Sequence, residues 1–386
     1  MAEEVINKQQ LSFKDKALKV YKRISHAFHN GTFVYILRRI VSSLFTLFLL
    51  TAIVTALLRF LPDTKFYPIQ EYNKMRGQIG EAAADRWRNM QLYLAGRRKR
   101  DGSEISLLES IFTYFYYVLP IPKAIPEKYD TSYKIVTIFH LTGMYFGKAT
   151  SQSGSPFITN LFIEKMGISF KISILTTFFT YLLSIPLGIA MAKKPGGIID
   201  KIGNIFIVLN YAIPALVFYL IMNSVMGRVD LIFGVFKFGT VYSDEKWQSL
   251  VPPIFCIVFL SIPGVSIWVR RFMVDELSSD YVKFARSKGL SENRIMYTHV
   301  LRNACVPLVR NLPATFIGAI IGSYYVEHIW SIPGTGSLLT GALSGNPDVQ
   351  LVQSLTFLYA ALSMLSFLLG DIITVFADPR IKILSN

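Results

Sequence analysis

The sequence has few charged residues and few cysteines for its length. Charged side chains make up 17% of the 386 residues, whereas 52% of the residues are hydrophobic. That balance is too apolar for a soluble protein of this size and indicates a lipid bilayer as the solvent. The two cysteines, Cys256 in an apolar run and Cys305 in a basic loop, exclude a framework of structural disulfides. We therefore expect an integral membrane protein with two free thiols.

Motifs for catalysis and for nucleotide or metal binding are also missing. The sequence contains no Gly-x-x-x-x-Gly-Lys-[Ser/Thr] run to hold phosphates, no His-Glu-x-x-His and no Cys-x-x-Cys. His26 and His29 have helical spacing but lack a third ligand, so a surface pair is the better interpretation. We expect no catalytic residue, no metal and no cofactor bound by this chain.

The formal net charge of +15 does not indicate a nucleic-acid partner. Lys and Arg gather at the ends of apolar runs instead of forming one basic face. The first 30 residues are polar and basic, and the first apolar run is too long for a signal-peptide core, so no cleavable signal is expected. Residues 1–33 are predicted to be a basic cytoplasmic segment. Its stretch 11–29 fits a helix on an anionic membrane surface and a solvated helix equally well.

Long uncharged stretches predict an all-α integral membrane protein with six spans. The first lies within residues 34–60 and has a charge-free centre at 40–58. At about 1.5 Å per residue, each stretch is long enough to cross the hydrocarbon. The other five are residues 172–192, 202–227, 247–269 and 349–370, together with 311–326, which continues past Glu327 to Trp330.

Basic residues at the membrane ends orient these spans, because short cytoplasmic segments are enriched in Lys and Arg. Arg38 and Arg39 precede the charge-free centre of the first span, Lys193 and Lys194 follow the second span, and Arg270 opens a basic loop. The loop at 331–349 has no basic residue. We therefore predict that both termini and the loop 275–305 are cytoplasmic.

Residues 61–168 are predicted to form an extracytoplasmic insertion, followed by a membrane core at 169–386. Loops of this length cross membranes largely regardless of charge. Within the insertion, residues 69–96 and 104–119 are predicted to be helical, with an exposed turn between them. The apolar pieces at 105–119 and 135–147 are short for spans. If both crossed the membrane, eight helices with the same end topology would result.

The loop between the fourth and fifth spans carries the most information. Ser279 can cap a helix over 280–288, and Gly289 can end that helix in the left-handed conformation. Tyr281, Phe284 and Ala285 share one face of it. Ser291 can cap a second helix that runs to about Ala304, before Pro307 opens the next span.

The residues of this loop resemble the cytoplasmic coupling loop of permease subunits in binding-protein-dependent ABC importers, most closely the dipeptide and oligopeptide branch. Lys283-Phe284-Ala285 departs from the broader Glu-Ala-Ala form of that motif. The resemblance rests on the following runs: Asp280-Tyr281-Val282-Lys283-Phe284-Ala285-Arg286-Ser287-Lys288-Gly289-Leu290-Ser291, His299-Val300-Leu301-Arg302-Asn303-Ala304 with Pro307, Tyr35-Ile36-Leu37-Arg38-Arg39, Ile185-Pro186-Leu187-Gly188, Ile213-Pro214, Val326-Glu327, Ile332-Pro333-Gly334-Thr335-Gly336 and Asp378-Pro379-Arg380-Ile381.

The resemblance implies a fold of the type I importer kind and a non-catalytic pore subunit that moves peptides. It implies that Tyr281, Ala285, Arg286 and Gly289 lie at the contact with an ATPase. The implied partners are a second homologous permease, two ATP-binding subunits that use ATP and Mg, an extracytoplasmic substrate-binding protein, the peptide and membrane lipid. Nickel, heme or another small solute is the alternative substrate, and the implied location is a bacterial-type cell membrane.

The outer part of the core holds the residues predicted to form a translocation path or gate. Pro186, Pro214 and Pro263 can kink pore helices or serve packing alone. Glu327 either meets the amino group of an entering peptide, or pairs with a neighbour such as His328 and holds the turn at 332–336; we favour the second. The predicted path residues are Pro214, Glu327, Pro333, Gly334 and Gly336.

Two rival classes fit less well. A self-sufficient secondary transporter needs charged residues deep in several spans, and these spans are nearly free of charge. A membrane-embedded enzyme needs a paired nucleophile and base or a set of metal ligands, and neither pattern is present.

Overall fold

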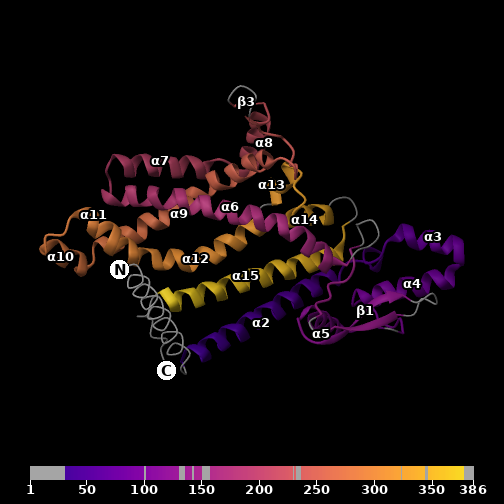
Figure 1. Ribbon diagram of the computed structural model, residues 1–386. Helices are drawn as coiled ribbons and strands as arrows, with labels where there is room; N and C mark the ends of the chain where they lie inside the picture. The colour runs from indigo at the N-terminus through magenta and orange to yellow at the C-terminus, as the bar shows by residue number, and fades with distance from the viewer. Residues whose placement is uncertain are drawn as a thin grey trace, which may run out of the picture.

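The computed structural model describes residues 31–99, 101–129, 135–140, 143–149, 157–228, 230–231, 236–322, 324–343 and 347–377. Within these ranges, five helices are long and apolar enough to cross a membrane, and a bent pair gives a sixth. The predicted fold class is confirmed (Figure 1). Residues 1–30, including His26 and His29, and the run Asp378-Pro379-Arg380-Ile381 lie outside the described residues.

Among the described residues, five long helices form the membrane core, and they lie side by side (Figure 1). Their apolar composition lets every backbone group bond within the helix, as a bilayer requires. α6 packs along α9, and α12 packs between α6 and α15. They are α2 (Gly31–Leu58), α6 (Ile158–Lys193), α9 (Val251–Leu277), α12 (Leu301–Gly322) and α15 (Val349–Ala377). α6 starts before residue 169, where the core was predicted to begin.

The third predicted span is broken into α7 (Ile198–Ala212) and α8 (Ala215–Met226), which meet at an angle of 93°. Pro214 has no N–H to continue the helix, and Ile213 before it is extended, with φ −86° and ψ 118°. The predicted kink at Pro214 is therefore confirmed. α6 and α9, by contrast, continue through Pro186 and Pro263.

The insertion folds beside the outer end of α2. The two helical stretches predicted there are confirmed, and the first is interrupted at Gly80, which has φ 91°. An antiparallel hairpin, with Lys123 opposite His140, replaces the apolar piece at 135–147 and was not predicted. The elements are η1 (Asp63–Lys65), α3 (Ile69–Ile79), α4 (Glu81–Leu94), α5 (Leu107–Val118), β1 (Lys123–Tyr129) and β2 (Ile135–His140).

The loop between α9 and α12 contains α10 (Asp280–Ser287), α11 (Glu292–Arg294) and a π-helical turn, η3 (Ile295–Val300). The predicted helix after Ser279 is confirmed, although the Ser279 side chain makes no capping hydrogen bond. The predicted end of the second helix near Ala304 is wrong. The helix continues from Glu292 to Gly322 with Pro307 and Pro313 inside it, because membrane helices tolerate proline where neighbouring groups satisfy the freed carbonyls.

The outer side of the core is completed by short elements. α13 (Tyr324–Ile329) and α14 (Thr335–Leu343) lie between α12 and α15, and the α8–α9 connection holds β3 (Asp230–Leu231), β4 (Phe236–Lys237) and η2 (Trp247–Leu250). Figure 1 shows α10 and α11 at one end of the long helices and α13, α14 and the insertion toward the other.

Candidate functional site

α10 ends in a Schellman motif at Gly289. The Leu290 N–H donates to the Ala285 carbonyl at 3.3 Å, and the Gly289 N–H donates to the Arg286 carbonyl at 2.9 Å. Gly289 has φ 73°, and a Cβ on it would meet no atom within 4 Å. The requirement for glycine is thus conformational, because an L side chain is strained at this φ.

One face of α10 packs into the core and the other faces outward. Val282 is fully buried and Ala285 is 7% exposed, in a cluster with Met273 and Ile295. Phe284 is 61% exposed, and the Lys288 Nζ lies 4.4 Å from the centre of its ring. The predicted common face of Tyr281, Phe284 and Ala285 is therefore divided between the core and the surface.

Polar contacts fix α10 to its neighbours. The Tyr281 hydroxyl donates to Glu276 Oε2 at the end of α9 at 2.6 Å. Arg286 donates through Nε to Glu292 Oε1 at 2.8 Å and thereby joins α10 to α11. Among the four residues expected at an ATPase contact, Ala285 is buried, Tyr281 is half-buried, and Arg286 and Gly289 are exposed.

A second anchor joins the α6–α7 turn to α9 on the same side of the core. Asp200 is 2% exposed and accepts from Arg270 Nε at 2.5 Å and Nη2 at 2.7 Å. It also accepts the Gly196 N–H at 2.8 Å. A bidentate pair of this kind fixes direction as well as distance, so α7, α9 and α10 are held as one unit.

At the other end of the core, Glu327 is fully buried and holds the predicted turn at 332–336. Its Oε2 accepts the Gly336 N–H at 2.7 Å and the Ser337 N–H at 3.2 Å, at the first turn of α14. Its Oε1 accepts the Ser169 hydroxyl of α6 at 2.6 Å. These bonds fit the favoured interpretation, in which Glu327 holds the turn, and Ser169 is a side-chain partner of the carboxylate.

The glycines of this turn are required by space. A Cβ on Gly334 would lie 2.4 Å from Glu327 Cδ and 2.4 Å from Ser169 Oγ, and one on Gly336 would lie 2.6 Å from the Tyr324 Cα. Distances this short leave no room for any side chain. The small residues of the Pro-Gly-Thr-Gly sequence therefore allow its backbone to pack directly against the buried Glu327 carboxylate.

Between these two ends, hydroxyl groups line a partly open cavity of about 240 Å³ between α6, α8, α9 and α12. Thr177 is 7% exposed, and its Oγ1 has no hydrogen-bond partner among the described residues. Polar groups at membrane depth face protein or a water-filled path rather than lipid. The lining hydroxyls belong to Thr176, Thr177, Thr180, Tyr219, Ser261 and Thr315.

The cavity is chemically suited to an uncharged polar ligand. Hydroxyls both donate and accept hydrogen bonds, and none of the described lining residues carries a charge. The five predicted path residues do not line it: Pro214 lies at the α7–α8 bend, and the other four lie at or beside the Glu327 turn. Thr176, Thr177 and Thr180 within one apolar run were the available sequence signal, and the sequence reasoning missed it.

The comparison with known protein families identifies the family of this chain. Residues 184–383, more than half of the chain, match the family described as "Binding-protein-dependent transport system inner membrane component". The chain belongs to this family. This inner membrane component is accordingly a multi-pass membrane protein. The elements from α7 to α15 lie within the matched region, the cavity threonines of α6 lie just before it, and α2 and the insertion lie outside it.

Curated relatives of this inner membrane component carry peptide-transport names. Oligopeptide transport system permease protein AmiC of Streptococcus pneumoniae is 36% identical over 205 residues, which are 53% of this chain and 40% of that protein. Dipeptide transport system permease protein DppB of Lactococcus lactis subsp. cremoris is 27% identical over 64% of this chain and 79% of that protein. The match thus spans about two fifths of the length of AmiC.

Among solved structures, an inward-facing form of the MetNI methionine ABC transporter aligns with a TM-score of 0.46 and 17% identity. The alignment covers 57% of this chain and 98% of that chain.

Proposed function

We propose that this chain forms one half of the membrane pathway of an ATP-driven importer, without catalytic activity of its own. The observation that carries the proposal is α10, a short helix ended by Gly289 and anchored to α9, α11 and the core. Because α10 is anchored in this way, a displacement of its outer face moves α9, α11 and the packed core with it.

In this proposal, ATP-binding subunits cause the displacement of α10. Phe284, Lys288 and Arg286 form the outward face that meets an ATPase, whereas Tyr281 and Ala285 support the face from inside. Two ATP-binding subunits use ATP and Mg, and a second homologous permease completes the pathway. Both termini and the α10 loop are then cytoplasmic, in agreement with the basic residues near the membrane ends.

The proposed substrate is a peptide delivered by an extracytoplasmic binding protein. The names of the relatives support this substrate class. The hydroxyl-lined cavity supports it too, because neutral donors and acceptors suit the amide groups that every peptide shares. A lining without charge does not favour peptides of one charge type.

Uptake of a labelled oligopeptide by vesicles that contain the complete transporter tests the proposal. Gly289→Val places a β-branched residue at φ 73° and disrupts the end of α10. We expect uptake to fall at least about tenfold, which corresponds to an increase of about 1.4 kcal/mol in the activation free energy of transport. Membrane insertion and assembly should persist.

Gly80→Val is the matched control. Gly80 has φ 91° and also has no atom within 4 Å of an added Cβ, so a valine there is strained as well, but the residue lies between α3 and α4 of the insertion, away from α10 and its anchors. We expect its uptake to remain near that of the wild type. Equal loss in both variants, or peptide uptake that persists when the ATP-binding subunits are absent, would contradict the proposal.

A further inference from the structure

We propose that α5 of the insertion inserts its exposed apolar face into the outer leaflet of the bilayer, beside α2. This inference goes beyond the proposed transport and does not depend on the substrate. Leu108, Phe112 and Tyr116 form a row at every fourth residue and are 69%, 60% and 46% exposed. The sequence has no charged residue between Glu109 and Lys123. A row of this size and composition needs an apolar partner.

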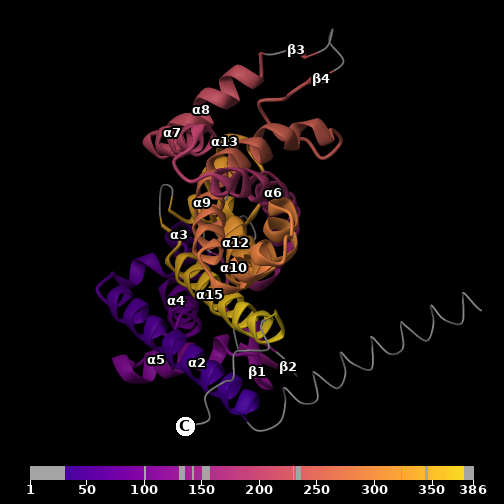
Figure 2. The same ribbon diagram turned by 90° about the vertical axis from the view of Figure 1, so that its left-hand side faces the viewer.

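The position of α5 identifies lipid as that partner. The Phe48 ring of α2 lies 5.4 Å from the Phe112 ring and 5.2 Å from the Phe115 ring. Phe48 is near the middle of the charge-free run at 40–58, about 15 Å along the helix from Leu58. Figures 1 and 2 both show α5 alongside α2. The apolar row thus continues the lipid-facing side of a membrane span.

α5 runs in the opposite direction to α2 and descends from its outer end. Arg59, directly after α2, donates from Nη2 to the carbonyl of Ile105, which precedes α5. The contact with Phe48 comes later, at Phe112 and Phe115. The C-terminal end of α5 therefore lies deeper beside α2 than its N-terminal end does.

The last carbonyl groups of α5, at its deep end, accept hydrogen bonds from within the protein, as a lipid environment requires. Lys123 is 2% exposed, and its Nζ donates to the carbonyls of Tyr116, Tyr117 and Leu119. A helix end in water has no need of a buried lysine, because water satisfies the last carbonyls. The buried ammonium also suits the negative end of the helix dipole.

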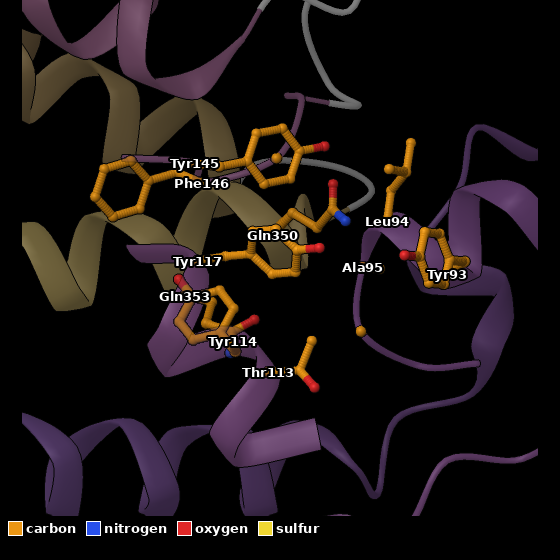
Figure 3. Close-up of a pocket in the computed structure, with 12 residues that line it drawn as sticks. Tyr93, Leu94, Ala95, Thr113, Tyr114, Tyr117, Tyr145, Phe146, Gln350 and Gln353 are labelled. Atoms are coloured by element: carbon orange, nitrogen blue, oxygen red, sulfur yellow. The ribbon is translucent and has the colours of Figure 1, made fainter. Parts of the chain in front are cut away.

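The polar side of α5 faces protein. Tyr114 and Tyr117 line a cavity together with Gln350 and Gln353 of α15; Figure 3 shows the two tyrosines and the two glutamine amides around the same space. α5 therefore separates this cavity, which two of its tyrosines line, from the apolar row on its other side. An interfacial helix needs this division of its surface.

Spin labels test the inference in the complete transporter, reconstituted in vesicles of phosphatidylethanolamine and phosphatidylglycerol. In a Cys305→Ser background, where the remaining Cys256 is buried, single cysteines replace Phe112 or Leu108 and carry the label. Phe45→Cys on α2, a site 66% exposed, is the lipid control, and Gln78→Cys on exposed α3 is the water control.

We expect labels at Phe112 and Leu108 to collide severalfold more often with oxygen than with a water-soluble nickel chelate, as the Phe45 label does. Nickel collision equal to that at Gln78 would show the row in water and overturn the inference. Protection from both reagents would show that a protein covers the row, which also overturns it. Use of both positions covers the case in which one variant does not fold.

Discussion

At the scale of single residues, the buried carboxylate of Glu327 organises the outer end of the core. A buried carboxylate is stable only when hydrogen bonds replace its lost hydration. The Glu327 carboxylate accepts one hydrogen bond from α6 and two from the start of α14. Because the donors come from separate segments, the carboxylate fixes the relative position of those segments.

Gly334 makes this arrangement possible, and its replacement tests it. Gly334→Ala would bring a methyl group to 2.4 Å from Glu327 Cδ and Ser169 Oγ. We expect a loss of about 1–3 kcal/mol in stability, the usual range for overpacking, measured as a lower thermal midpoint in detergent. Gly167→Ala in α6 is the control, because an added Cβ there meets nothing within 4 Å. Equal midpoints for the two variants would show that the turn is loosely packed.

At the scale of elements, the insertion is tied to the end of α2 through Asp63. Arg97 donates to Asp63 Oδ1 at 2.9 Å and Arg98 donates to Oδ2 at 3.0 Å. Arg97 also donates to the Leu61 carbonyl at 2.8 Å. Burial alone would raise the pKa of Asp63, but the hydrogen bonds from the two arginines outweigh burial and hold the pKa below its usual value.

This lowered pKa predicts that acid loosens the insertion. The pKa of Asp63 is lower in the folded protein than in the unfolded chain. The stabilisation that the ionised Asp63 carboxylate gives is therefore complete above about pH 4 and is lost as the pH falls through the folded pKa. We expect cleavage within residues 69–94 by an acid protease to rise as the pH falls below about 4. The protease should cut the Asp63→Asn variant readily across the whole acid range, because the neutral amide cannot form ion pairs with Arg97 and Arg98.

Glu104→Gln is the control for this prediction. Glu104 lies 3.8 Å from Arg98 and its side chain is 84% exposed, so the pair contributes little. The pH profile of this variant should match the wild type. A wild-type profile in Asp63→Asn would show that Asp63 does not hold the insertion.

Most elements could be predicted from the sequence because their signals are local. Charge-free runs marked the spans, and Gly289 marked the end of α10 at the position where the structure has φ 73°. The hairpin of β1 and β2 was not predicted, because the apolar residues of β2 resemble a short membrane segment. The two faces of α10 also escaped, because helical spacing groups Phe284 with Ala285 but does not show which of them meets the core.

At the scale of the whole molecule, α6 links the three candidate sites. Ser169 of α6 bonds to Glu327, Thr177 lines the hydroxyl cavity, and Ile189 packs in the cluster that holds Val282 and Ala285 of α10. α6 is continuous from Ile158 to Lys193. In the proposed mechanism, a displacement of α10 therefore reaches the cavity and the outer turn through one helix.

The sequence marks only one wall of the cavity, the three threonines of α6, and does not show which residues complete it. Its hydroxyls come from four helices, and their convergence depends on how each helix is rotated about its axis. Nothing local in an apolar run encodes that rotation relative to distant helices. Glu327 was found because a lone carboxylate beside a span stands out, whereas threonine within a span does not.

The central claim, that α10 receives an ATP-binding subunit, is tested most directly by crosslinking at Phe284. In a Cys305→Ser background, Phe284→Cys should crosslink to an ATP-binding subunit in membranes, to an extent that changes with nucleotide. Asp244→Cys, on the exposed α8–α9 connection, should react instead with an impermeant thiol reagent added outside intact cells. Labelling of Phe284→Cys from outside, or no crosslink in the assembled transporter, would contradict the account.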